Sequence, residues 1–117
     1  GGTWLLPRWI GWSKAAEIIF AGRTLSAVEA LGLGLVSQVA EKTELLPSAR
    51  ALAAEIAAGA PLAVQAAKRM MRAGLGEGFV EHIQRVYLQV FPLMRSQDFR
   101  EGVAAFMEKR QPKFEGR

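Results

Sequence analysis

The chain has 117 residues, of which 50% are hydrophobic, and its six Phe and three Trp suffice for one modest core but not for two domains. It has no cysteine, which excludes disulfides and thiolate metal sites, and no apolar run is long enough to span a membrane. The net charge of +4 permits an anionic partner, but the fifteen Lys and Arg are interleaved with acids, which favours a mildly basic, solvated surface.

The first predicted elements are short helices that alternate with glycines. Ser13 precedes a run of helical character and predicts an N-cap for a helix over residues 14–21. Ser26 is followed three residues later by Glu29, and this capping-box pattern predicts a second short helix that ends at Leu31. Glycines follow both helices and supply their stops, because glycine readily adopts the left-handed conformation that ends a helix.

Residues 35–39 are the only segment whose pattern favours a β-strand. The sequence Leu-Val-Ser-Gln-Val contains two β-branched residues and lies between glycines and charges. A single strand leaves its backbone groups unpaired, and no second strand pattern occurs in the chain. We therefore expect the partner strands to belong to polypeptide outside this sequence.

Three consecutive helices are predicted between residues 43 and 94. Thr43 is the expected N-cap of the first, which runs to Gly59, and Pro61 opens the second because proline suits a first helical turn. The third covers residues 79–94, where apolar side chains recur every three or four positions. That apolar stripe is formed by Phe79, Ile83, Val86, Val90 and Met94.

The last twenty-two residues predict a docked terminal helix with a cationic end. Asp98 is the expected N-cap, and Glu101 three residues later completes a capping box. Lys109 and Arg110 follow at the negative end of the helix dipole, and Pro112 is the expected stop. The apolar stripe of this helix consists of Val103, Phe106 and Met107.

Side chains capable of catalysis are few. His82 is the only histidine, and on a helix dominated by packing positions a packing role is more common than a general-base role. Glu17 is suited to acid–base work only if burial raises its pKa. No cluster of His and carboxylates has metal-ligand spacing, and no Ser lies in a nucleophile elbow. The residues alone therefore predict neither a catalytic group nor a metal site in this chain.

Three segments carry motifs in a distinctive order and spacing. The first reads Gly-Gly-Thr-Trp-Leu-Leu-Pro-Arg-Trp-Ile-Gly at positions 1–11. The second reads Leu-Ser-Ala-Val-Glu-Ala at positions 25–30, with Gly-Leu-Val at positions 34–36. The third is the tail, with Ala-Phe at positions 105–106 and Glu-Lys-Arg at positions 108–110. Together they resemble the C-terminal signatures of the crotonase superfamily, the enoyl-CoA hydratases and isomerases.

The resemblance implies a mainly α chain that forms the C-terminal portion of a crotonase-type spiral (ββα) fold. Residues 1–42 are expected to be the last turn of the spiral core, and residues 43–117 a helical oligomerisation region that makes trimers. The oxyanion hole and the catalytic carboxylates of the family are expected upstream of Gly1, so no catalytic residue is assigned here. The implied enzyme hydrates an enoyl-CoA thioester or moves its double bond, and this chain alone is expected to be inactive.

The resemblance also implies two ligand contacts. Phe106 and Lys109 correspond to a Phe and a Lys that in the hydratases contact the adenine and phosphate end of CoA, usually from a neighbouring subunit. An aromatic ring can stack on adenine, and an ammonium can meet a phosphate as a point charge. The competing interpretation makes Phe106 the docking anchor of its helix and Lys109 a partner of the helix dipole. No metal and no cofactor are expected, except coenzyme A as part of the substrate.

The implied partners are an acyl-CoA substrate, the upstream catalytic segment and further copies in a homotrimer or dimer of trimers, in the cytoplasm and without nucleic acid or membrane. One alternative is a stand-alone helical adaptor module, against which the lone strand and the three tryptophans among the first twelve residues argue. Another is a basic nucleic-acid binder, for which Lys68, Arg69 and Arg72 are the best candidates. These three cations also fit the ordinary polar face of an amphipathic helix.

Overall fold

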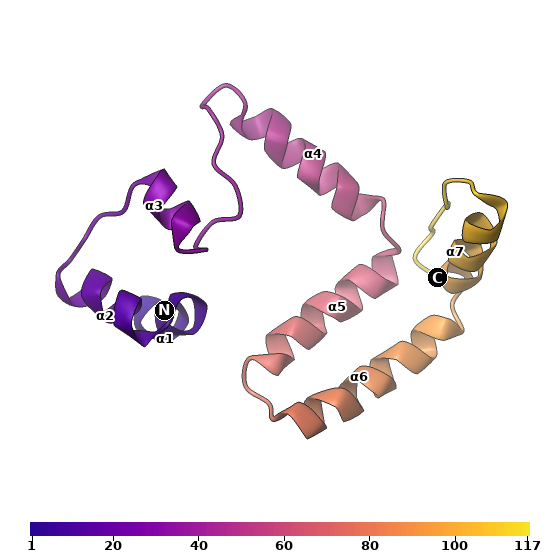
Figure 1. Ribbon diagram of the computed structural model, residues 1–117. Helices are drawn as coiled ribbons and strands as arrows, with labels where there is room; N and C mark the ends of the chain where they lie inside the picture. The colour runs from indigo at the N-terminus through magenta and orange to yellow at the C-terminus, as the bar shows by residue number, and fades with distance from the viewer. The chain divides into compact units, whose positions relative to one another are not determined.

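The computed structural model describes residues 1–117 and contains seven α-helices and no β-strand (Figure 1). The helices are α1 (Gly2–Ile10), α2 (Trp12–Phe20), α3 (Ala27–Gly32), α4 (Leu45–Ala57), α5 (Pro61–Gly74), α6 (Phe79–Met94) and α7 (Gln97–Glu108). Contacts divide the chain into two compact units, Gly1–Ala49 and Arg50–Arg117. The mainly α prediction is confirmed. The proposed division into a spiral turn and an oligomerisation region stays a prediction.

In the first unit, α1 and α2 pack against each other across a glycine corner. Gly11 joins them with φ 80° and ψ 158°, a conformation that side chains disfavour, and it serves as the N-cap of α2. The prediction that Ser13 caps this helix is wrong, because the corner lets α2 begin one residue before Ser13. Ala15 is the only buried residue of the pair, so the contact is made by a small side chain.

The capping box predicted for α3 is confirmed. The Ser26 hydroxyl accepts a hydrogen bond from the backbone N–H of Glu29 at 3.2 Å. In return the Glu29 carboxylate accepts the backbone N–H of Ser26 at 2.9 Å. Two donors that a helix start would otherwise leave unpaired are therefore satisfied, which explains how a helix of only six residues is held.

The strand predicted at residues 35–39 is wrong. The segment is a bend followed by irregular chain, and the backbone N–H of Leu35 donates to the carbonyl of Ala30 at 2.9 Å, which closes the turn after α3. Val36 and Val39 are 41% and 44% exposed. A β-ladder needs a neighbouring strand, and all regular elements of this chain are helices.

The second unit centres on the helical hairpin of α5 and α6, which lie side by side (Figure 1). Pro61 occupies the first turn of α5 and α6 covers residues 79–94, both as predicted. Arg69 donates to the side chain of Gln89 at 3.2 Å and links the two helices. α4 begins only at Leu45, and Thr43 lies in the preceding turn, so its predicted capping role is not observed.

The buried side chains of the chain are small. They are Ala15, Ala66, Ala105 and the single aspartate of the sequence, Asp98. Large apolar side chains lie mostly at the surface, since Trp4, Trp9 and Trp12 are 52%, 55% and 72% exposed. No helix combines the length and the apolar character that crossing a membrane requires.

Candidate functional site

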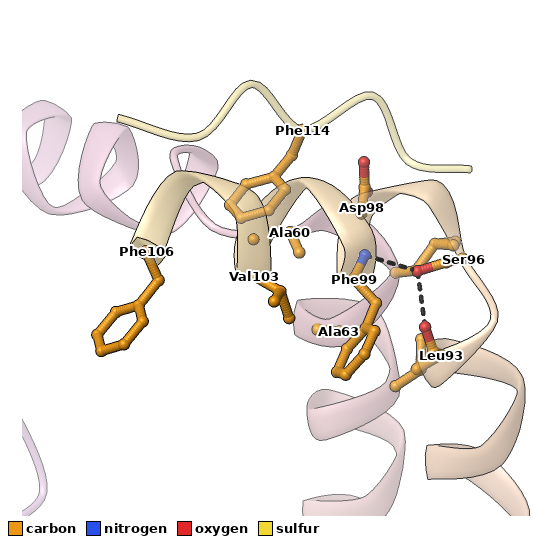
Figure 2. Close-up of a pocket in the computed structure, with 11 residues that line it drawn as sticks. Ala60, Ala63, Leu93, Ser96, Asp98, Phe99, Val103, Phe106 and Phe114 are labelled. Atoms are coloured by element: carbon orange, nitrogen blue, oxygen red, sulfur yellow. Dashed lines mark hydrogen bonds between the residues drawn. The ribbon is translucent and has the colours of Figure 1, made fainter. Parts of the chain in front are cut away.

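The start of α7 is fixed by a serine. The Ser96 hydroxyl accepts the backbone N–H of Phe99 at 3.0 Å and donates to the carbonyl of Leu93 at 2.7 Å, so it ties α7 to the end of α6 (Figure 2). The capping box predicted for Asp98 and Glu101 is wrong. Ser96 has the extended backbone of an N-cap and comes first along the chain, which places Asp98 inside the first turn of α7.

Asp98 instead holds the C-terminal tail. Its side chain is 3% exposed, and its two carboxylate oxygens accept the backbone N–H groups of Glu115 and Gly116 at 2.7 and 2.8 Å. The backbone N–H of Asp98 donates to the carbonyl of Arg117 at 3.0 Å. A buried carboxylate requires such donors, and here two backbone amides of the tail provide them. The tail is therefore folded back along α7.

Glu101 makes a second attachment for the same segment. Its oxygens accept bidentate hydrogen bonds from the Arg110 guanidinium at 2.6 and 2.9 Å, and one of them also accepts the backbone N–H of Lys113 at 2.7 Å. The hydrogen bonds from Arg110, followed by that from Lys113, lower the pKa of Glu101 to about 2. The same pairing raises the pKa of Arg110, with Glu108 as its second acid partner. Glu101 therefore stays ionised at neutral pH.

Phe114 completes the attachment with an apolar contact. Its ring lies over α7 in Figure 2, and it approaches Gly102 so closely that a β-carbon there would lie 3.6 Å from the ring. Near the end of the tail, Gly116 has a φ of +77° and lies against Pro61 at the start of α5. The tail thus makes polar contacts with one part of α7 and apolar contacts with another.

The two side chains predicted to contact ligand, Phe106 and Lys109, lie together at the C-terminal end of α7. Phe106 is 83% exposed and Figure 2 shows its ring directed away from the helix, so it does not act as a docking anchor within this chain. Lys109 is also exposed and forms no ion pair. Lys109 lies just beyond the helix, because α7 ends at Glu108, and its backbone is left-handed.

A cavity of about 360 Å³ opens beside these residues, between α5, α6, α7 and the tail. Its lining is almost wholly apolar and includes three phenylalanines, namely Phe99, Phe106 and Phe114. Ala60, Ala63, Leu93 and Val103 contribute further apolar surface (Figure 2). Such a surface suits contact with an apolar group rather than proton transfer.

The acids of the first unit form a separate, exposed cluster. Arg23 bridges Glu17 at 2.5 Å and Glu29 at 3.2 Å, and Lys14 also pairs with Glu17 at 3.1 Å. The hydrogen bond from Lys14 is the main cause that lowers the pKa of Glu17. Acid–base work near neutral pH needs a raised carboxyl pKa, so this environment does not prepare Glu17 for it. The pKa of Glu29 is also lowered, mainly by the backbone N–H of Ser26.

His82 lies at the corner between α5 and α6. Its Nδ1 is 3.3 Å from a carboxylate oxygen of Glu77, and its ring lies against Gly74, where an added β-carbon would come within 3.1 Å. Arg85 also pairs with Glu77 and is the main cause that lowers the pKa of that acid. These contacts fit the packing role predicted for His82. No group of three or more His, Cys, Asp or Glu side chains in the chain is arranged to hold a metal ion.

Comparison with known proteins identifies relatives along the whole chain. The profile of the enoyl-CoA hydratase/isomerase family matches residues 1–117. The protein YngF of Bacillus subtilis (strain 168) is 42% identical over 119 aligned residues, which cover 99% of this chain and 45% of YngF. The carnitinyl-CoA dehydratase of Proteus mirabilis (strain HI4320) is 39% identical over 122 residues, covering 100% of this chain and 46% of that enzyme.

A solved structure gives the same extent of similarity. The crystal structure of an enoyl-CoA hydratase from Bacillus anthracis superposes with a TM-score of 0.97 at 37% identity, covering all of this chain and 45% of that one. The matched part of such enzymes is their C-terminal portion. The chain therefore spans somewhat less than half the length of the proteins that it matches.

Proposed function

The chain belongs to the enoyl-CoA hydratase/isomerase family, and from that premise we propose that the protein containing it acts on acyl-CoA thioesters. The reaction is the addition of water to a 2-enoyl-CoA or the migration of its double bond. Both reactions pass through an enolate of the thioester, which preorganised backbone N–H groups stabilise at roughly 3–4 kcal/mol per donor. The observation that carries the proposal is the match of the family profile to every residue from 1 to 117.

The proposal assigns the chemistry and the nucleotide contact to different parts of the enzyme. The oxyanion donors and the carboxylates that move protons belong to the part of the family fold outside residues 1–117. Within these residues, the hydrogen bond from Lys14 lowers the pKa of Glu17, and His82 packs at a helix corner. The role proposed for this chain is to cover the catalytic part of the enzyme and to bind the nucleotide end of the substrate.

Phe106 and Lys109 are the proposed contacts for that nucleotide end. Phe106 offers an aromatic face that is 83% exposed, and stacking on a base contributes about 1–3 kcal/mol where it has been measured. Lys109 offers an exposed ammonium without an acid partner, which suits a phosphate. Both contacts serve coenzyme A as a part of the substrate, and the ligand bound by them belongs to a neighbouring subunit.

The assembly and the compartment are part of the same proposal. We propose a homotrimer or a dimer of trimers, to which α4–α7 contribute contacts, and a cytoplasmic enzyme that uses no cofactor besides the CoA of its substrate. The exposed apolar side chains on α6 support a contact with further polypeptide, since Tyr87, Leu88 and Phe91 are 58%, 71% and 60% exposed.

Steady-state kinetics with crotonyl-CoA and the truncated substrate crotonyl-pantetheine test the proposal. The 117-residue chain alone is expected to show no turnover, and the enzyme that includes it is expected to turn over both substrates. In that enzyme, Phe106→Ala and Lys109→Ala should each raise KM for crotonyl-CoA by about five-fold or more, and leave KM for crotonyl-pantetheine unchanged. The pantetheine thioester lacks the adenine and phosphates, so it isolates the contacts that are being tested.

Met107→Ala is the matched control, because Met107 is 75% exposed and directly follows Phe106. Equal effects of all three substitutions would contradict the assignment of Phe106 and Lys109. Robust turnover by the chain alone would contradict the placement of the catalytic groups. Binding to DNA with a steep salt dependence would favour the nucleic-acid alternative, and an inactive but oligomeric full-length protein would favour the adaptor module.

A further inference from the structure

Lys109 occupies a backbone conformation that lysine disfavours. It has φ 54° and ψ 40°, the left-handed region, and it is the only residue other than glycine with positive φ. The N–H of Arg110 donates to the carbonyl of Ala105 at 3.0 Å, which is the pattern of a Schellman motif. Glycine usually fills this position, and a residue with a β-carbon is held there only when its surroundings enforce the conformation.

Glu101 restrains the backbone at this turn. Its carboxylate accepts two hydrogen bonds from Arg110, the residue directly after Lys109, and one from the backbone N–H of Lys113. The chain on the C-terminal side of Lys109 is thereby fixed to the middle of α7. Glu108 also pairs with Arg110, at 2.5 Å, but it contacts no backbone group of the tail.

The two adjacent cations of this turn, Lys109 and Arg110, differ in their pairing. Arg110 is neutralised by the two acids that bind it, Glu101 and Glu108. Lys109 has no carboxylate partner and is exposed. The contacts of Glu101 with Arg110 and with the backbone N–H of Lys113 form a clamp. This clamp restrains the backbone at Lys109 and leaves its ammonium group unpaired.

We propose that Glu101 is a positioning residue for phosphate binding: it holds the turn at Lys109 so that the ammonium stands ready beside Phe106. The inference rests on the proposed function, since the phosphate belongs to the nucleotide end of the acyl-CoA. Glu101 itself does not touch the ligand. It acts by reducing the freedom that Lys109 would lose when it binds.

The test compares two acids that bind the same arginine, by equilibrium titration of the assembled enzyme that contains residues 1–117 with adenosine 3′,5′-bisphosphate and with adenosine. The dissociation constant for adenosine divided by that for the bisphosphate measures the contribution of the phosphates. Glu101→Ala should reduce that ratio by about three-fold, because an ordered exposed ion contact is worth about that much. Glu108→Ala removes an equal charge next to the same arginine and should leave the ratio unchanged. Lys109→Ala removes the ammonium itself and should give the lowest ratio of the variants.

Amide hydrogen exchange in the same samples reports the clamp directly. Faster exchange of the Lys113 N–H in Glu101→Ala, and not in Glu108→Ala, is expected together with the loss of phosphate preference. If Lys113 loses protection while the phosphate preference persists, the positioning role is overturned and the proposed function stands. If the wild-type enzyme binds the bisphosphate no better than adenosine, the ligand assignment of Lys109 fails, and the inference fails with it.

Discussion

The two ends of the chain differ in how many of their polar and apolar groups find partners within the chain. Residues 96–117 place a buried aspartate, a bidentate ion pair and an aromatic ring between α7 and the tail. Residues 1–20 form two helices whose N-caps are glycines without side-chain hydrogen bonds, and they bury one alanine. Trp12 and Phe20 of this helix pair are 72% and 80% exposed.

The difference shows which region is stabilised by contacts within the chain and which region is not. The C-terminal segment is held by specific polar contacts over separations of nine to nineteen residues. The N-terminal helices have an apolar surface that little of their own sequence covers, since Trp4 and Trp9 are also about half exposed. Large exposed apolar patches indicate contact with other polypeptide. Stability of the first region is thus expected to depend on its surroundings, and that of the second on its own side chains.

The largest effect is expected from Asp98→Ala. The substitution removes the acceptor for two buried backbone N–H groups, and the expected cost is about 3 kcal/mol of local stability in α7 and the tail. Hydrogen exchange of the Glu115 and Gly116 amides measures it. Gln97→Ala, one residue earlier and exposed, is the control. Unchanged protection in Asp98→Ala would remove the main difference between the two ends of the chain.

Acid should weaken the same region through Glu101. The pKa of this group is lowered from 4.5 to about 2, so its stabilising contribution is complete above pH 4.5 and disappears as the pH falls toward 2. The chemical shift and exchange rate of the Lys113 amide should follow this titration. In Glu101→Ala the chemical shift and the protection factor of that amide should no longer change between pH 2 and 4.5. A midpoint near 4.5 in the wild type would contradict the ion pair.

Two serines sharpen the comparison within the first unit. Ser26→Ala should destabilise α3 by about 1 kcal/mol, because it removes the observed cap. Ser13→Ala should change stability by less than about 0.5 kcal/mol, because Ser13 lies inside α2 and caps nothing. Amide exchange in α3 measures the effect of Ser26→Ala, and amide exchange in α2 measures that of Ser13→Ala. Equal effects would mean that Ser13 caps α2 in solution, as the sequence pattern predicts.

Lys109→Gly should act in the opposite direction. Glycine accepts the left-handed conformation without strain, so this substitution is expected to stabilise the end of α7 by about 1 kcal/mol. Met107→Gly, inside the helix, should destabilise it by a similar amount. Urea dependence of amide exchange in α7 measures both. A stabilised variant with weakened phosphate binding would show that Lys109 is retained for its charge and not for its backbone.

The smallest effect is expected at Trp12. Because its side chain is 72% exposed, Trp12→Gln should change the stability of the isolated chain by less than about 0.5 kcal/mol. Acrylamide should quench the indole fluorescence of the isolated chain readily. Protected indoles in the 117-residue chain would show that the first unit covers its own apolar surface, and the contrast between the two regions would then be lost.

Sequence reasoning predicted several elements from local signals, although the caps expected at Ser13 and Thr43 were not observed. The capping box at Ser26, the proline at the start of α5 and the limits of α6 depend on residues within a few positions of each other. The strand at residues 35–39 was wrong because a β-pattern needs a partner, and pattern alone does not supply one. A segment with high β-propensity but without a neighbouring strand to hydrogen-bond remains irregular.

The attachment of the tail was missed for a different reason. Asp98 and Glu101 have the spacing of a capping box, yet both bind residues at least nine positions away. No periodicity marks such contacts. The one available signal was that the only aspartate in the sequence lies near a small residue, Gly102, on which Phe114 can rest. By contrast Phe106 and Lys109 were singled out by a family motif; both side chains are exposed, and their contact with ligand stays a prediction.

The arrangement around Asp98 makes the last residues sensitive to trimming. The carbonyl of Arg117 and the amides of Glu115 and Gly116 all bind this one residue. A break in the chain before Glu115 would therefore remove the donors of a buried carboxylate and destabilise the first turn of α7, although that turn lies seventeen residues earlier in the sequence.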